Sequence, residues 1–499
     1  MDLTTLKFLI LVALAVLGYY LVPKRMQWIW LLGAGYVYYA MCDTAFVKYM
    51  VFTTLTTYAA GLLLGRVRSK GSRKAVMILC LLLNFGMLGF LKYSNFIIEI
   101  FNGLAHRNIS LLVLVAPLGI SFYTFQSMGY VLDVYWKRIE PDKNPFRLAL
   151  FVSFFPQIMQ GPIGRYSRLA NQLYESHRFD IVRTEQAMFR ILWGFFKKLV
   201  IADTAAVFVA PLFDDFQTYS GCAILAVLFY AIQLYADFSG GIDVVIGIGM
   251  LFGIEMDENF RQPYFSISIG DFWHRWHITL GAWMKDYLFY PVTLSGWMKK
   301  IGKGAKKVFG KKIGRALPIC LANIIVFFVV GIWHGPEWKY IIYGLYNGLI
   351  IGISGMLTDN FRSWKKKLGI NDKGKPWHLF MILRTFILVL ISFYFDRAAN
   401  VSDAFAMMKN SVTQFDPGQL LTITSESGQT ALQMILIILA GLVPLLIHSI
   451  QKERGVDTLS AISARPAPVR ILLFLALFFV LGLIGEMPSL TGGFIYAQF

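Results

Sequence analysis

The sequence predicts an all-α integral membrane protein, on three observations. Hydrophobic residues make up 57% of the 499 residues and charged residues only 15%, a composition outside the range of soluble domains. Apolar runs long enough to cross a bilayer recur along the whole chain, and basic residues gather between them. We expect about eleven to fourteen transmembrane or re-entrant helices in a single polytopic domain, residues 1–499.

The apolar runs define the expected elements in chain order. The first run lacks a charged n-region and a cleavage site before Pro23, so we expect a retained helix. Phe146 to Ile163 carries Pro156 and Gln160, which favours a broken or half-inserted helix buried inside the protein. A polar segment, 400–428, is expected to form a small extramembrane piece. The runs are Leu6 to Val22, Met26 to Met41, Phe46 to Leu64, Ala75 to Tyr93, Leu111 to Trp136, Phe146 to Ile163, Gln186 to Phe213, Gly221 to Phe252, Trp273 to Leu294, Ala316 to Trp333, Lys339 to Leu357, Trp377 to Phe395, Ala431 to His448 and Ile471 to Glu486.

The basic loops predict the orientation, because short loops rich in Lys and Arg stay on the cytoplasmic side. The loop from Arg66 to Lys74 contains no carboxylate, which places it inside and, counting backwards, the N-terminus outside. The loop from Lys299 to Arg315 is the most basic and is expected to be cytoplasmic. The net charge of +18 therefore indicates loops facing anionic lipid headgroups, and nucleic-acid binding is a poor explanation.

Two histidines, His277 and His334, each lie in an aromatic, strongly hydrophobic stretch. An ionisable residue at bilayer depth usually faces a protein interior or a watery cavity, and histidine is suited to moving protons near neutral pH. Gly335 and Pro336 would interrupt the helix at His334 and free space for a substrate. The alternatives are a hydrogen-bonded interior histidine at 277 and a wet helix end at 334.

The segment around His277, GDFWHRWHITLGAWMKDYLFYP from Gly270, alternates aromatic and charged residues and suits an interface or a cavity wall. Asp271 is expected to cap a helix on which His274 and His277 share a face. This pair is half of a metal site, but no Cys or acid stands at ligand spacing, so we expect no metal. The candidate substrate-binding residues are Trp273, Trp276, Trp333, Asp237, Lys285 and Asp286.

Asp237 and Asp243 form a further polar cluster inside a glycine-rich apolar stretch. The glycines favour close helix packing over phosphate binding, because their spacing misses the dinucleotide fingerprint. The two aspartates are either ion or proton sites, as in a transporter, or they fix neighbouring polar groups in a catalytic core.

Several long motifs occur in order over about residues 8–350, and together they resemble one family. They are PLGISFYTFQSMGYVLDVY from Pro117, FVSFFPQIMQGPIGRY from Phe151, YAIQLYADFSGGID from Tyr230, NFRQPYFSISIGDFWHRWHITLGAWMKDYLFYP from Asn259 and GIWHGPEWKYIIYGLYNG from Gly331. The chain resembles the membrane-bound O-acyltransferase family, in particular its bacterial branch with the alginate O-acetyltransferase membrane subunit and the teichoic acid D-alanyltransferase.

The resemblance implies helices around a central catalytic channel in a bacterial cytoplasmic membrane. It implies transfer of an acyl group, most simply acetyl, from a cytoplasmic thioester to a hydroxyl of an exported polysaccharide or an extracytoplasmic partner protein. The donor would be acetyl-coenzyme A or an acyl carrier protein, with no bound cofactor. His334, in the WHG motif, would be the catalytic base, and His277, in the RWH motif, would orient the donor or stabilise the oxyanion. Direct transfer is expected first and a transient acyl-histidine second.

Departures from the family pattern leave the acceptor open. Pro291 is followed by VTLSGWMKK and the lysine-rich loop where relatives have PLGGNR, and His274 stands where an arginine or asparagine is often found. The lysine loop would hold coenzyme A phosphates or the acidic face of a carrier protein, or it only sets the topology. Other functions to weigh are D-alanyl transfer to teichoic acid, a transporter or flippase using Asp237, and a scaffold for export proteins.

Overall fold

The computed structural model describes residues 3–485 and Phe494, and its regular structure there is helical. Within those residues the only strand-like pairings are two isolated bridges, Phe260 with Trp276 and Thr424 with Thr430. Six helices in the described part of the chain are long and apolar enough to cross a membrane, or seven if one bent pair is a single span. The all-α prediction is confirmed, and the number of elements that cross or enter the membrane stays a prediction.

The chain divides into two compact units, and one long helix, α11 (Ala223–Leu251), belongs partly to each. Unit 1 comprises Met1–Val200, Tyr235–Glu258 and Val456–Phe499, and unit 2 comprises Ile201–Leu234 and Asn259–Gly455. The other helices of unit 1 are α1 (Leu6–Leu21), α2 (Gln27–Cys42), α3 (Val47–Arg66), α4 (Lys70–Ala105), α5 (Ile120–Tyr135), α6 (Pro145–Ser153), α7 (Phe155–Ile158), α8 (Tyr166–Tyr174), α9 (Ile181–Phe195), α21 (Thr458–Ser463) and α22 (Ala467–Gly485), with short turns η1 (Lys24–Met26) and η2 (Thr44–Phe46) and most of the π-helical η3 (Phe196–Ala202). Unit 2 contains α10 (Asp203–Asp214), α12 (Ile269–Arg275), α13 (Ile278–Met284), α14 (Tyr290–Thr293), α15 (Gly296–His334), α16 (Trp338–Met356), α17 (Thr358–Lys367), α18 (Lys375–Arg397), α19 (Val401–Thr413) and α20 (Ala431–Glu453), with η4 (Ser220–Cys222), η5 (Pro263–Phe265), η6 (Lys285–Phe289) and η7 (Pro417–Thr422).

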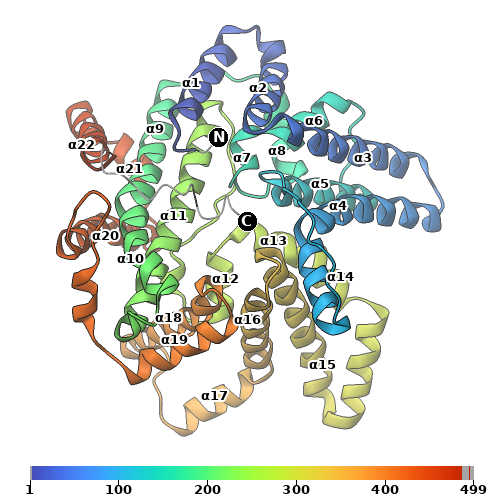
Figure 1. Cartoon of the computed structure of the whole chain (residues 1–499). Helices are drawn as coiled ribbons and strands as arrows, with labels where there is room; N and C mark the ends of the chain where they lie inside the picture. The colour runs from blue at the N-terminus through green and yellow to red at the C-terminus, as the bar shows by residue number, and fades with distance from the viewer. Residues whose placement is uncertain (1–2, 486–493, 495–499) are drawn as a thin grey trace. The chain divides into compact units, whose positions relative to one another are not determined.

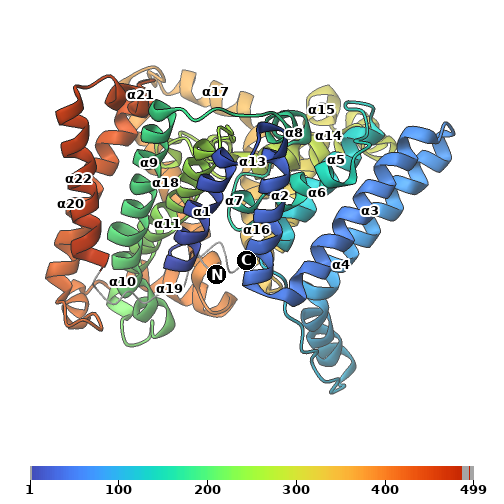
Figure 2. The ribbon, with the colours of Figure 1, turned by 90° about the horizontal axis from the view of Figure 1, so that it is seen from above.

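Unit 1 has apolar side chains outside and polar side chains inside. On α4, which runs beside α3 in Figures 1 and 2, Leu79 and Leu82 are 59% and 65% exposed. On α5, by contrast, Gln126, Ser127 and Asp133 are buried. Lipid-facing surfaces are apolar, and polar groups are tolerated at membrane depth when they face protein. This distribution is therefore typical of a membrane-embedded helical unit.

Two predicted elements of unit 1 are interrupted, each for a local backbone reason. The run from Phe146 to Ile163 splits into α6 and α7, as predicted, with Pro156 in the first turn of α7, where no donor is lost. The run from Leu111 to Trp136 is helical only from Ile120, because Gly119 adopts a left-handed conformation with φ of 70°.

The lysine-rich stretch of unit 2 was predicted as a loop, and this prediction is wrong. Lys299 to Arg315 is helical and lies inside α15, which folds back on itself at Gly310, where φ is 85° (Figure 1). A Cβ atom on Gly302 would lie 3.0 Å from the Gly314 carbonyl oxygen, so the two arms pack backbone against backbone. Lys and Arg are good helix formers, and one glycine is enough to reverse the chain.

The polar segment 400–428 contains α19 and η7 and carries several side-chain caps. Asn400 caps α19 by accepting from the amide of Asp403 at 2.9 Å, and Asp416 caps η7 by accepting from the amide of Gly418 at 3.0 Å. Its place outside the membrane stays a prediction, as does the single-domain organisation of the whole chain.

Candidate active site

His334 is the last residue of α15, where the sequence predicts that the helix ends. Gly335 is extended, and α16 starts at Trp338. Glycines bring the two helices into backbone contact: a Cβ on Gly331 would lie 2.3 Å from the Tyr340 carbonyl oxygen. This tight α15–α16 pairing holds the imidazole of His334 in the interior of unit 2, only 2% exposed. The predicted helix break is confirmed, and the alternative of a wet helix end is wrong.

A buried carboxylate faces the imidazole of His334. The Nδ1 atom of His334 lies 3.3 Å from Oδ1 of Asp396, near the end of α18. Tyr230 on α11 donates its hydroxyl proton to Oδ2 of the same carboxylate at 2.8 Å. All three side chains are buried. A carboxylate beside Nδ1 favours the tautomer with its proton there, which leaves Nε2 as the basic nitrogen.

Neither Asp396 nor Tyr230 was predicted as a site residue from the sequence. Asp396 is 62 residues from His334 in sequence, and neither residue belongs to a motif containing the histidine. One signal was available, since Asp396 directly follows the apolar run Trp377 to Phe395, and an acid at such a position is expensive unless it has a partner.

Aromatic rings surround the two histidines. The ring centroid of His334 lies 4.9 Å from that of Tyr343 and 5.9 Å from that of Tyr340. Trp333, 5% exposed, contacts both histidines, with centroid distances of 5.6 Å to His277 and 5.3 Å to His334. The structure thus brings His277, Trp333 and His334 together in one buried, aromatic environment.

His277 is held in an unusual backbone conformation between α12 and α13. Its φ of 47° and ψ of 54° are left-handed, and it is the residue before α13. Asn259 braces this turn, because its Oδ1 accepts from the amide and hydroxyl of Thr279 at 2.9 and 2.7 Å and lies 3.4 Å from Nδ1 of His277. Left-handed conformations at non-glycine residues are strained and cluster at functional sites.

The charge of His277 follows from its surroundings. The ring is 2% exposed and lies outside the six candidate membrane spans. Burial, and to a smaller extent the neighbouring His334, lowers the pKa of His277 to about 3. His277 is therefore neutral at physiological pH.

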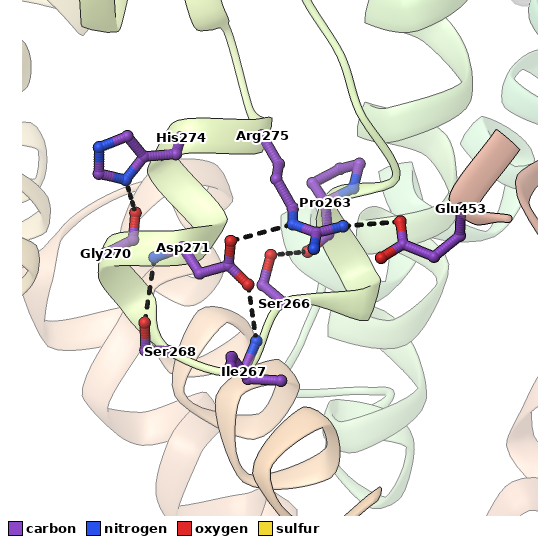
Figure 3. Close-up of polar contacts among 9 residues, drawn as sticks. All are labelled: Pro263, Ser266, Ile267, Ser268, Gly270, Asp271, His274, Arg275 and Glu453. Carbon is purple, nitrogen blue, oxygen red and sulfur yellow. Dashed lines mark hydrogen bonds and ion pairs between the residues drawn. The ribbon is translucent and has the colours of Figure 1, made fainter. Parts of the chain in front are cut away.

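His274 and His277 do not share a helix face, so the prediction that they do is wrong. The helix α12 ends at Arg275, and His277 belongs to the next turn. His274 is exposed, and its Nδ1 lies 2.6 Å from the Gly270 carbonyl oxygen, turned away from the polar cluster beside it (Figure 3). Within the described residues no group of three or more His, Cys, Asp or Glu side chains has metal-binding geometry.

Asp271 was predicted as a helix cap, and it instead sits inside the first turn of α12. Ser268 is the N-cap and accepts from the amide of Asp271 at 3.1 Å, while Asp271 accepts from the amide of Ile267 at 3.1 Å (Figure 3). Arg275 then joins Asp271 to Glu453 of α20, at 3.0 and 2.8 Å. These caps and ion pairs hold α12, the helix that precedes His277 in the chain.

The other candidate substrate-binding residues of unit 2 lie in different environments. Trp273 is half-buried, and its indole Nε1 donates to Oδ1 of Asn347 at 3.0 Å. Trp276 is 1% exposed and stacks on Phe272 at 5.4 Å. Lys285 is exposed and Asp286 half-buried on η6, which follows α13. A substrate-binding role for these residues and for Trp333 stays a prediction.

Asp237 forms a buried ion pair in unit 1, and the half-buried Asp243 forms two more. Asp237 accepts from Nζ of Lys198 at 2.7 Å, with both side chains nearly inaccessible. Asp243 binds Lys197 at 2.7 Å and Arg190 at 2.9 Å. Of the two roles considered for these aspartates, this geometry fits the fixing of neighbouring polar groups. Substrate binding by Asp237 stays a prediction.

Comparison with known proteins identifies the family. The model of the membrane-bound O-acyltransferase family matches residues 138–393. The chain is 33% identical over 432 residues to a probable alginate O-acetylase of Pseudomonas aeruginosa, covering 85% of this chain and 77% of the relative. It is 31% identical over 411 residues to a peptidoglycan O-acetyltransferase of Helicobacter pylori, covering 77% and 73%. A teichoic acid D-alanyltransferase of Bacillus subtilis is 29% identical over 288 residues, covering 56% and 68%. The chain belongs to the membrane-bound O-acyltransferase family, and it is a multi-pass membrane acyltransferase.

Proposed function

We propose that this chain transfers an acyl group, most simply acetyl, from a cytoplasmic thioester to a hydroxyl of an exported cell-surface polysaccharide or of an extracytoplasmic relay partner. The relatives named for alginate and peptidoglycan acetylation support this substrate class. The observation that carries the chemistry is the buried arrangement of His334, Asp396 and Tyr230. The protein would reside in the cytoplasmic membrane of a bacterium, with its N-terminus outside and its helices around a central channel.

In the proposed reaction His334 is the general base. Its Nε2 takes the proton of the acceptor hydroxyl as that oxygen attacks the thioester carbonyl carbon. The tetrahedral intermediate collapses, the C–S bond breaks, and the thiolate leaves with the proton returned by the imidazolium. Asp396, near Nδ1, stabilises the imidazolium while it exists and keeps the ring in the productive tautomer. Tyr230 holds the carboxylate in place through its hydrogen bond.

His277 takes the second role in this proposal. A neutral imidazole in a dry site can donate a hydrogen bond to the developing oxyanion, which is worth more there than in water. Asn259 fixes the backbone turn that carries His277 by accepting from the amide and hydroxyl of Thr279. Donation to the oxyanion requires the tautomer of His277 with its proton on Nε2. Direct transfer remains the first mechanism, and a transient acyl-histidine is the second.

Two other functions remain to be separated from this one. The Bacillus relative's name makes D-alanyl transfer to teichoic acid from a carrier protein the alternative within the family. A transporter or flippase would rest on Asp237. The buried partner of that residue, Lys198, neutralises the charge that such a role needs. Substrate flux that is lost in Asp237→Asn while acyl transfer never occurs would favour transport.

The experiment offers labelled acetyl-coenzyme A and an acyl-loaded carrier protein separately to the purified protein in lipid vesicles, with a polysaccharide acceptor and extracytoplasmic partner proteins supplied. We expect one donor to be consumed and its label to appear as an alkali-labile ester. Protein-free vesicles are the control. If neither donor is consumed beyond that control, the acyl-transfer proposal is overturned.

A further inference from the structure

The two arms of α15 enclose a groove of about 580 Å³ whose walls are strongly basic. Its cationic side chains come from both arms, and all of them are exposed. They are Lys299, Lys303, Lys306, Lys311 and Arg315. Met298 and Pro318 contribute apolar surface. The histidine centre does not explain this groove.

The hairpin geometry creates the concentration of charge. On the first arm, Lys299, Lys303 and Lys306 are spaced four and three residues apart, which places them on one face of the helix. After the reversal at Gly310, Lys311 and Arg315 repeat the four-residue spacing on the second arm. Gly314 lets the arms approach, because a Cβ there would lie 2.5 Å from Cβ of Lys306. The two faces therefore line one groove.

These cations have no carboxylate to balance them. No acidic residue occurs between Asp286 and Glu337. In the described ranges no ion pair reaches any of the five groove cations, although Lys312, outside the groove, pairs with Asp359 at 3.3 Å. Like charges held together in a concavity repel one another, and an anionic ligand relieves that repulsion.

We propose that this groove binds the phosphates of a coenzyme A thioester, and this inference rests on the proposed acyltransferase function. The diphosphate and 3′-phosphate of coenzyme A present several negative charges to the cations, and lysine is an effective point-charge partner for phosphate. The volume lies within the usual range for small-molecule sites. The positive-inside rule puts this hairpin on the side where the donor is made.

The role of positive charge in setting membrane orientation does not explain why these five cations line one groove. The same stretch carries Lys300 and Lys307, which add equally to the cytoplasmic positive charge but do not line the groove. They stand seven residues apart, on another face of the first arm. They therefore provide a matched control that removes the same charge from the same element.

The test compares Lys303→Gln/Lys311→Gln, one change on each arm, with Lys300→Gln/Lys307→Gln. In the full-length protein, we measure kcat/KM for acetyl-coenzyme A and for acetyl-pantetheine, which has the thioester without phosphates. The preference is the ratio of kcat/KM for acetyl-coenzyme A to that for acetyl-pantetheine. We expect this ratio to fall about tenfold in the groove variant, because two cation–phosphate contacts are lost. In the control variant it should stay within about twofold of the wild-type ratio. Binding of adenosine 3′,5′-bisphosphate, followed by calorimetry, should weaken in parallel.

The outcomes separate this inference from the function on which it rests. If acyl transfer proceeds and both double variants keep the wild-type preference, the groove assignment is overturned and the acyltransferase stands. If the nucleotide binds the groove but no thioester is consumed, the phosphate site stands and the proposed function fails. If only binding to phosphatidylglycerol vesicles weakens in the groove variant, the cations recognise lipid headgroups, and the donor assignment is overturned.

Discussion

The two units bury charged groups in different ways. In unit 1 each buried acid lies beside a lysine or an arginine, as where Asp237 binds Lys198 at 2.7 Å and Asp133 binds Arg138 at 3.1 Å. In unit 2 the buried acid Asp396 faces the imidazole of His334, a side chain that can serve as a general base. A buried ion pair stabilises the fold, and removing either charge leaves the other buried without it. A carboxylate–histidine pair can exchange a proton with a substrate and recover. Burial alone therefore does not identify the chemical site.

The largest expected effect is on the stability of unit 1. Asp237→Asn leaves the ammonium of Lys198 buried without its carboxylate, which costs about 3–5 kcal/mol. We expect a clearly lower midpoint of thermal unfolding in detergent. Asp372→Asn, which removes an exposed partner of Lys365, is the control and should leave the midpoint unchanged. An unaltered midpoint in Asp237→Asn would show that this pair holds no structure.

The corresponding change in unit 2 should affect rate more than stability. Asp396→Asn removes the charge that stabilises the imidazolium of His334, so we expect kcat to fall on the order of 100-fold, with a smaller change in KM. Steady-state acyl transfer by protein with a normal elution volume and helix content measures this. Wild-type kcat in this variant would remove Asp396 from the mechanism.

A smaller effect is expected at His277. His277→Ala removes the proposed hydrogen-bond donor from the buried site, and we expect kcat to fall roughly tenfold to a hundredfold. Burial keeps the pKa of His277 well below its usual value, so the ring stays neutral from about pH 5 to pH 8. The pH profile of kcat/KM should therefore keep its shape in His277→Gln. A limb of the profile that disappears would mean that His277 itself titrates.

The smallest effect is expected at Tyr230. Tyr230→Phe deletes one hydrogen bond to Asp396 and leaves the ring packing intact, so we expect kcat to fall about fivefold. In Asp396→Asn the same change should have less effect, because Tyr230 acts through the carboxylate. If the losses of kcat in Tyr230→Phe and Asp396→Asn simply multiply in the double variant, Tyr230 does not act through Asp396.

Sequence predicted local events of the fold better than long-range ones. The helix end at His334 followed from Gly335 and Pro336, whose effects are local. The prediction that His274 and His277 share a helix face was wrong. The helix ends at Arg275, and the next residue, Trp276, forms a bridge with the distant Phe260. The lysine-rich stretch was predicted as a loop from its charge alone. Positive charge indicates the side of the membrane, but Lys and Arg are also good helix formers, so it does not exclude a helix. The pairing of Asp396 with His334 could not be predicted, because it depends on a tertiary contact between residues far apart in the sequence.

The central claim is that His334 performs the proton transfer of the acyl-transfer reaction. The most direct measurement is single-turnover consumption of the active donor by His334→Ala, compared with His274→Ala, which removes an exposed histidine on α12. We predict that His334→Ala is folded and membrane-inserted but transfers no acyl group above background, while His274→Ala keeps wild-type turnover. Retained turnover in correctly folded His334→Ala would contradict the mechanism.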